Sequence, residues 1–239
     1  MAPSEALLEL SGVEAGYGKK QVLGGISLSV GHGEAVALLG HNGAGKTTTL
    51  RTAFGLEPLW GGSVAFEGTE LSRRFRPRDA VELGMAMIPA ERFVFPDLSV
   101  GDNLLLSARS LRLPERVARI EEAYTAFPIL GERRKQLAGT MSGGEQRMVS
   151  LSMALMTKPR LLLLDEPSLG LSPVIAESIM ARVRGLVDDG MSVVLVEQNV
   201  ALALSVASRV YVIRAGGVIV AEASTDFENR GKEAWWKLF

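Results

Sequence analysis

The stretch from Gly40 to Thr48 constrains this chain more than any other. It fits the pattern Gly-x-x-x-x-Gly-Lys-[Ser/Thr] and lies between an apolar run, 34–39, and a segment that can start a helix. A glycine loop between a strand and a helix turns backbone N–H groups inward around a triphosphate, and the helix N-terminus favours an anion. Lys46 is then placed to meet the β- and γ-phosphates, and the Thr47 hydroxyl is placed to ligate Mg²⁺. The alternative is a glycine-rich turn with a chance lysine. The predicted nucleotide-binding residues of this stretch are Gly40, His41, Asn42, Gly43, Ala44, Gly45, Lys46, Thr47 and Thr48.

Composition narrows the classes of protein further. The 239 residues are 47% apolar and 22% charged, which suits one large globular domain or two small ones. A net charge of −1 implies no general attraction to nucleic acid, and the lack of cysteine excludes disulfide and thiolate chemistry. No apolar run approaches the roughly 18 residues of a membrane span, and the N-terminus lacks the basic start of a signal peptide. We expect a cytoplasmic protein whose membrane association comes through a partner.

Tyr17 is a candidate nucleotide contact because of its position before the glycine loop. Residues 7–13 are predicted to form a strand, and 26–30 alternate apolar and polar side chains like a strand with one solvated face. Two antiparallel strands that lead to the nucleotide site could place Tyr17 over an adenine, where stacking contributes roughly 1–3 kcal/mol. The alternative is an ordinary turn residue between Gly16 and Gly18.

Two acids follow a second buried strand. The run 161–164 is entirely leucine and ends in Asp165 and Glu166. Adjacent carboxylates at the end of a buried strand are costly unless a cation or water chemistry uses them. We therefore predict that Asp165 holds Mg²⁺ and that Glu166 orients or deprotonates the attacking water. The alternative is a pair of acids that only marks the exit of a strand.

A helical region separates these two motifs. Apolar residues recur every three to four positions within 113–127, which predicts a core-facing helix in an inserted helical subdomain. Ser142-Gly143-Gly144-Glu145-Gln146 then opens another helix whose free N–H groups suit an anion, although a plain serine N-cap explains it equally well. Phe93 and Phe95 lie in the preceding loop, either packed locally or exposed as a contact surface for another protein.

Three elements thus occur in a fixed order: 40–48, 142–146 and 161–166. This arrangement resembles the ATP-binding subunit of ABC transporters over essentially the whole chain. The resemblance implies an α/β P-loop NTPase with a mixed sheet core, an N-terminal antiparallel β subdomain and an inserted helical subdomain. It implies a single domain, 1–239, with about 1–84 and 158–239 as the core and antiparallel sheet, and about 85–157 as the helical subdomain. It also implies that Tyr17 stacks on adenine. The residues that would act on ATP held by a partner subunit are Ser142, Gly143, Gly144 and Glu145.

Within the family the chain is most similar to the LivF-type subunits of branched-chain amino acid importers, chiefly over 165–173 and 195–199. Most ABC ATPases carry a γ-phosphate-contacting histidine where this chain has Gln198, so Gln198 is expected to act at the catalytic site. The chain departs from the family after Pro89, where Ala90 replaces the usual glutamine or glutamate and cannot ligate Mg²⁺ or water. Glu91 follows and could substitute if the loop shifts.

The resemblance predicts an ATP-hydrolysing importer subunit that uses ATP and Mg²⁺. Its expected partners are a second ATP-binding subunit, permease subunits on the inner face of the membrane and, indirectly, a periplasmic substrate-binding protein. The alternatives are a urea or short-chain amide importer, a lipid exporter, a soluble ABC ATPase that acts on ribosomes or DNA, and a P-loop small-molecule kinase.

Overall fold

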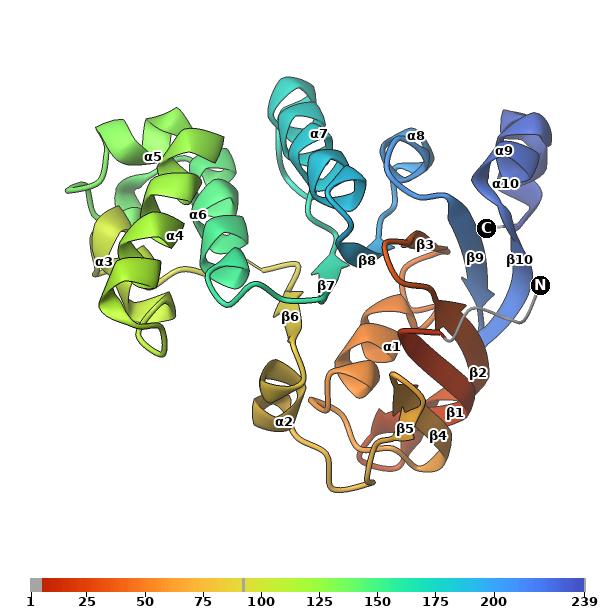
Figure 1. Cartoon of the computed structure of the whole chain (residues 1–239). Helices are drawn as coiled ribbons and strands as arrows, with labels where there is room; N and C mark the ends of the chain where they lie inside the picture. The colour runs from red at the N-terminus through yellow and green to blue at the C-terminus, as the bar shows by residue number, and fades with distance from the viewer. Residues whose placement is uncertain (1–5, 92, 239) are drawn as a thin grey trace.

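Helix α1 (Lys46–Ala53) lies between two β-sheets and ties them together. A computed structural model describes residues 6–91 and 93–238. In it, α1 contacts β1 and β2 of one sheet and β7 and β8 of the other (Figure 1). The glycine loop immediately precedes this helix, so both sheets fix its position.

The larger sheet is mixed, with the strand order β10-β9-β3-β8-β7-β6. Neighbouring strands from β9 to β6 run parallel, and β10 pairs antiparallel with β9. Every residue of β3, β7 and β8 is buried, which explains why these segments are nearly continuous apolar runs. The strands are β3 (Ala35–Leu39), β6 (Met85–Ile88), β7 (Leu161–Asp165), β8 (Ser192–Val196), β9 (Arg209–Arg214) and β10 (Gly217–Ala223).

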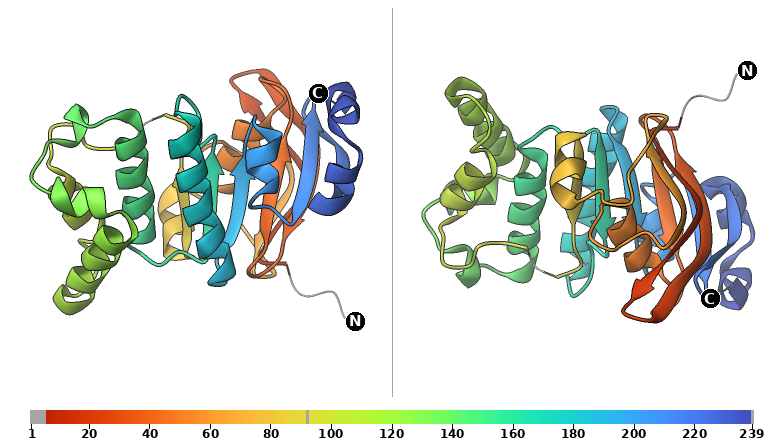
Figure 2. Two further views of the ribbon diagram at one scale, coloured as in Figure 1. Left: turned by 90° about the horizontal axis from the view of Figure 1, so that it is seen from above. Right: turned by 90° about the horizontal axis from the view of Figure 1, so that it is seen from below.

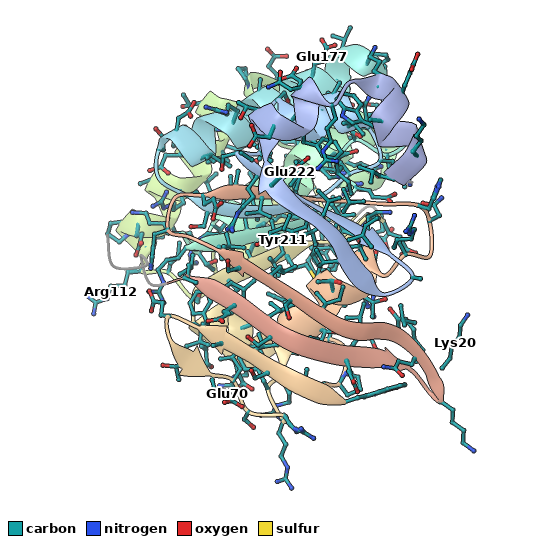
Figure 3. The ribbon with its side chains drawn as sticks, turned by 90° about the vertical axis from the view of Figure 1, so that its right-hand side faces the viewer. Lys20, Glu70, Arg112, Glu177, Tyr211 and Glu222 are labelled. Atoms are coloured by element: carbon teal, nitrogen blue, oxygen red, sulfur yellow. The ribbon has the colours of Figure 1, made fainter. Side chains whose placement is uncertain are left out.

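The smaller sheet is antiparallel and has the order β2-β1-β4-β5. Figure 3 faces it, with Lys20 near the end of the β1–β2 hairpin. Tyr17 lies beyond the predicted strand 7–13, yet it is the last residue of β1 and pairs with Lys20, and the register of β1 against β2 shifts at bulges between Leu10 and Gly16. The strands are β1 (Leu8–Tyr17), β2 (Lys20–Val30), β4 (Gly61–Phe66) and β5 (Thr69–Glu70).

Helices cover the face of the mixed sheet opposite α1, and a group from α3 to α6 extends beyond its β6 edge (Figures 1 and 2). Pro114 lies in the first turn of α4, where its missing N–H has no intrahelical partner to lose, and Pro128 opens α5 directly after α4. Within the described residues, no helix is long and apolar enough to cross a bilayer. The remaining helices are α2 (Pro77–Glu82), α3 (Val100–Ser107), α4 (Leu113–Ala126), α5 (Pro128–Glu132), a 3₁₀ turn (Ala138–Thr140), α6 (Gly143–Leu155), α7 (Pro173–Asp188), α8 (Val200–Leu204), α9 (Ser224–Asn229) and α10 (Lys232–Leu238).

The helical subdomain, expected from about residue 85, begins after β6. Residues 85–88 pair in parallel with β7 and therefore belong to the mixed sheet. One apolar cluster also joins α6 to the sheet, with Val149 and Leu164 both buried in it. The helical region is thus anchored to the core through α6 as well as through the chain connections.

Arg209 joins the antiparallel sheet to the mixed sheet and is itself fixed by an ion pair with Glu34. Arg209 of β9 forms two hydrogen bonds of 2.8 Å with the Glu34 carboxylate and donates another, also 2.8 Å, to the Ser29 carbonyl of β2. Its guanidinium also lies 5.3 Å from the centre of the Tyr211 ring. Such fork-shaped pairing adds geometric specificity that a point charge cannot supply.

We predict that Arg209→Met lowers the free energy of unfolding by about 2 kcal/mol, because charged hydrogen bonds are lost and Glu34 is left half-buried without its cation. Urea unfolding followed by circular dichroism measures this. Arg184→Met, which removes the exposed Arg184–Asp188 pair, is the control and should change stability by less than about 0.5 kcal/mol. Equal effects of the two substitutions would contradict the assignment.

Candidate nucleotide-binding and hydrolysis site

The conformation of the loop from Gly40 to Gly45 requires glycine at both ends. Gly40 has φ 150°, and a Cβ there would lie 2.2 Å from the Ile213 carbonyl oxygen. Gly45 has φ 112°, and a Cβ there would meet the Leu23 side chain at 2.8 Å. The loop is therefore wedged between β9 and the antiparallel sheet, and any other residue at either position would displace it.

Lys46 is a buried cation held by the loop itself. Its Nζ donates to the carbonyl oxygens of Gly40, at 2.7 Å, and His41, at 3.1 Å. Burial lowers the pKa of Lys46, and the carboxylates of Glu166, Asp165 and Glu197 oppose that shift. A buried ammonium facing acids and loop carbonyls is suited to exchange those carbonyls for phosphate oxygens.

Thr47 and Asp165 meet although they are far apart in the sequence. The Thr47 hydroxyl donates to Oδ1 of Asp165 over 3.0 Å, and the Asp165 side chain is buried at the end of β7. Burial raises the pKa of Asp165, Glu166 adds to that shift, and the Thr47 bond, Lys46 and Arg51 oppose it. A hydroxyl and a carboxylate side by side form a hard oxygen donor set of the kind that Mg²⁺ prefers.

Glu166 is held in a strained and well-defined conformation. Its φ is 46°, in the left-handed region that non-glycine residues rarely adopt, and its N–H donates to the Val196 carbonyl over 2.9 Å. The Gln198 amide donates to Oε1 of Glu166 over 2.8 Å. Strain of this kind is common at functional sites, and here it directs the Glu166 carboxylate, just after β7, toward Gln198, just after β8.

The sequence analysis assigned no role to Glu197, which is 2% exposed. Its carboxylate accepts the backbone N–H groups of Ser168, at 3.0 Å, Gln198, at 3.1 Å, and Asn199, at 3.4 Å. It therefore fixes the loop after Glu166 to the loop that carries Gln198. The available signal was the one used for Asp165, an acid directly after an apolar run, here residues 193–196.

A pocket of about 490 Å³ brings the expected phosphate and adenine contacts together. The Tyr17 side chain is 45% exposed and its hydroxyl is hydrogen-bonded to that of Thr48, at 3.3 Å. Lys20, Gln21 and Val22 also line the pocket, although the sequence analysis did not single them out. The remaining lining residues are Asn42, Gly43, Gly45, Lys46, Thr47, Glu166 and Ala215.

Three expected loop residues, Gly40, His41 and Ala44, are not part of the lining of this pocket. The carbonyls of Gly40 and His41 accept from Lys46, and the carbonyl of Ala44 accepts from the Gly216 N–H over 2.9 Å. Asp165 and Gln198 reach the site through Thr47 and Glu166, respectively. The structure thus separates residues placed to touch a ligand from residues that hold the loop.

The Ser142–Glu145 stretch lies elsewhere, at the start of α6 in the helical group (Figure 1). Ser142 and Glu145 form a reciprocal capping box, and Glu145 also pairs with Arg133 at 3.1 Å. Gly144 is required by packing, because a Cβ there would lie 2.5 Å from the Ile175 side chain of α7. Among the described residues that line the Tyr17 pocket, none comes from 142–145.

The loop that carries Ala90 is bound to α6 instead of supplying a side-chain ligand. The buried Arg147 donates to the carbonyls of Pro89, at 2.8 Å, and Ala90, at 2.6 Å. The Ser150 hydroxyl donates to the Phe93 carbonyl over 2.8 Å. This loop is therefore hydrogen-bonded directly to α6 at three points.

Replacing Asp165 tests whether its buried carboxylate lowers the stability of the fold while it supports ATP hydrolysis. Because its folded-state pKa is raised, ionising it costs stability, and that penalty is absent below its unfolded pKa and grows as the pH rises through the folded value. Asp165→Asn should therefore raise the melting temperature of the chain in EDTA at pH 7, while it abolishes Mg²⁺-dependent ATP hydrolysis. The stabilisation should vanish on acidification. A lower melting temperature of Asp165→Asn at pH 7 would contradict the destabilising effect of the ionised Asp165.

The sequence matches the ABC transporter family over residues 23–169. It is 41% identical over 214 residues to the Pseudomonas aeruginosa high-affinity branched-chain amino acid transport ATP-binding protein BraG, covering 90% of this chain and 91% of that one. It is 37% identical over 207 residues to a probable branched-chain amino acid transport ATP-binding protein LivF of Archaeoglobus fulgidus, covering 86% and 87%. The lipopolysaccharide export ATP-binding protein LptB of Escherichia coli is 34% identical, covering 92% of each chain.

Solved structures agree with this assignment. The fold matches that of an ATP-binding subunit of an ABC transporter with a TM-score of 0.82 and 27% identity, covering 97% of this chain and 99% of the other. A nucleotide-free ATP-binding cassette from an ABC transporter, 24% identical and covering 94% of each chain, has the same fold with a TM-score of 0.81. The predicted α/β fold is confirmed, and the chain belongs to the ABC transporter family as an ATP-binding, ATP-hydrolysing subunit.

Proposed function

We propose that this chain powers an importer for branched-chain, hydrophobic amino acids. The observation that carries the catalytic part is the 3.0 Å bond between Thr47 and Asp165, which joins the glycine loop to the acids of β7 beside Lys46. The substrate class is supported by the two branched-chain transport relatives at 41% and 37% identity.

The residues of the site divide the work of ATP hydrolysis. Lys46 binds the β- and γ-phosphates, and Tyr17 stacks on the adenine. Thr47 and Asp165 hold Mg²⁺, which neutralises phosphate charge when bound. Glu166 accepts a proton from the attacking water, and Gln198 holds Oε1 of Glu166 in place through its 2.8 Å bond. Gln198 donates hydrogen bonds without the positive charge that a histidine could carry.

A second ATP-binding subunit would complete the site. Since residues 142–145 lie away from the pocket of their own chain, their N–H groups would close on the γ-phosphate held by a partner. Permease subunits would contact the exposed rings of Phe93 and Phe95, whose loop is bound to α6 through Arg147 and Ser150. A periplasmic substrate-binding protein would choose the solute, and the complex would place this chain on the inner face of the membrane.

The transported solute is tested by uptake. A strain that lacks this gene should lose uptake of radiolabelled leucine, isoleucine and valine and regain it with the intact gene. Export of lipid is the second candidate because LptB is 34% identical over 92% of both chains. Normal amino acid uptake together with an envelope lipid defect would replace the first proposal by the second.

Glu166→Gln should keep ATP binding, slow hydrolysis by about 10²–10⁴-fold and prolong the closed dimer, because the proton acceptor is lost while the phosphate contacts remain. Light scattering after size exclusion in ATP and Mg²⁺ measures the dimer. Glu177→Gln on the outer surface of α7 is the control (Figure 3). A Glu166→Gln variant that stays monomeric with its partner subunit present would refute the coupling.

Lys46→Ala should abolish measurable ATP affinity, because a buried cation aimed at the phosphates is removed. Isothermal titration calorimetry with ATP and Mg²⁺ measures this, and Lys135→Ala, on the exposed surface of the helical region, is the matched control. Undiminished binding by Lys46→Ala would contradict the role of the glycine loop.

A further inference from the structure

A second pocket lies away from the nucleotide site, between the helical region and the core. It has a volume of about 160 Å³ and is lined by residues of α4, α6 and α7 and of the turn that follows α6. Cavities of about this size hold a benzene-sized apolar molecule. Its apolar walls include Phe127, Leu155, Met156, Leu186 and Met191.

Two buried polar atoms of this pocket lack hydrogen-bond partners. Among the residues that the structure describes, the buried side-chain atoms without a partner are Thr52 Oγ1, Arg116 Nε, Ser152 Oγ and Arg182 Nε, and both Ser152 and Arg182 line this pocket. The Ser152 side chain is 2% exposed. Buried polar groups in native proteins are almost always satisfied by protein, water or a ligand, so two such atoms from facing helices indicate a polar occupant.

The charges around the pocket favour an anion. Arg119, Lys158 and Arg182 line it together with one acid, Glu122, which is already paired with Arg119. Arg182 Nε can only donate, and Ser152 Oγ can donate as well as accept. An acceptor group with negative charge therefore satisfies both orphan atoms, whereas an ammonium group would face the excess of cations.

We propose that this pocket binds a small aliphatic carboxylate, with the carboxylate at Ser152 and Arg182 and the alkyl chain against Leu155 and Leu186. Because its walls come from α4 and α6 of the helical region and from α7 of the core, the bound molecule contacts both, and we expect it to restrain any motion between them that ATP turnover requires. Free fatty acid anions and hydrophobic amino acids share this chemistry, and the ammonium group of an amino acid would have Glu122 as its only acidic neighbour in the pocket lining.

Isothermal titration of the full chain with isovalerate tests the site. We expect saturable binding that weakens about tenfold or more in Arg182→Met and in Ser152→Ala, because each loses a hydrogen bond to the carboxylate. Arg184→Met, on the same helix but paired with Asp188 in solvent, is the matched control and should bind like the parent chain. Neutral isovaleramide and acetate, which lack the charge or the alkyl chain, should each bind more weakly than isovalerate.

A parallel titration with L-leucine distinguishes the two sources. Tighter binding of leucine than of isovalerate, lost in Glu122→Gln, would assign the pocket to amino acids, and the reverse order would assign it to simple carboxylates. ATP hydrolysis should fall as isovalerate saturates the parent chain and Arg184→Met, and should stay constant in Arg182→Met.

Three results would overturn the proposal. Absence of saturable binding by either probe would leave ordered water as the occupant. Equal affinities in Arg182→Met and Arg184→Met would place the bound anion elsewhere. Unchanged hydrolysis at full occupancy would refute the effect on turnover. Thermal unfolding of Ser152→Ala separates binding from folding, because removal of an unpaired hydroxyl should leave stability unchanged or higher.

Discussion

The structure depends on charged side chains that are buried at the carboxyl ends of the parallel strands of the mixed sheet. Lys46, Asp165 and Glu197 follow or end three neighbouring strands and are each at most 4% exposed. Isolated buried charges would be strongly unfavourable, so each has a specific partner: loop carbonyls, a threonine hydroxyl and backbone N–H groups, respectively. The fully buried strands β3, β7 and β8 provide the rigid support that keeps these partners in register.

Two loops that leave this edge are coupled by a single carboxylate. Glu197 accepts N–H groups from Ser168, beyond Glu166, and from the residues around Gln198. Glu166 itself lies two residues before Ser168 and accepts a hydrogen bond from Gln198, so it is linked to both loops. Away from this edge, Arg147 binds the Ala90 loop directly to α6. In the proposed function, these two connections would link the hydrolysis site to the helical region.

Local patterns predicted the elements whose physical causes are local. Continuous apolar runs gave the buried strands, and the glycine spacing gave the phosphate loop, because a central parallel strand and a tight turn each need their own residue types. The first strand was predicted to end near Val13 because glycines flank Tyr17, and only pairing with Lys20 extends β1 to Tyr17. Residues 85–88 were assigned to the helical subdomain, and only their pairing with β7 places them in the sheet.

The sequence by itself determined the family, the fold class and the chemistry available at the end of each strand, since these depend on residue types at fixed spacing. Tertiary structure decided which groups meet: the contact of Thr47 with Asp165, the hold of Gln198 on Glu166 and the clamp of Arg147 on the Ala90 loop. It also decided that α4, α6 and α7 enclose a pocket with two unpaired polar atoms. These contacts join positions from 32 to 118 residues apart, and such pairings follow from packing between elements rather than from any local pattern.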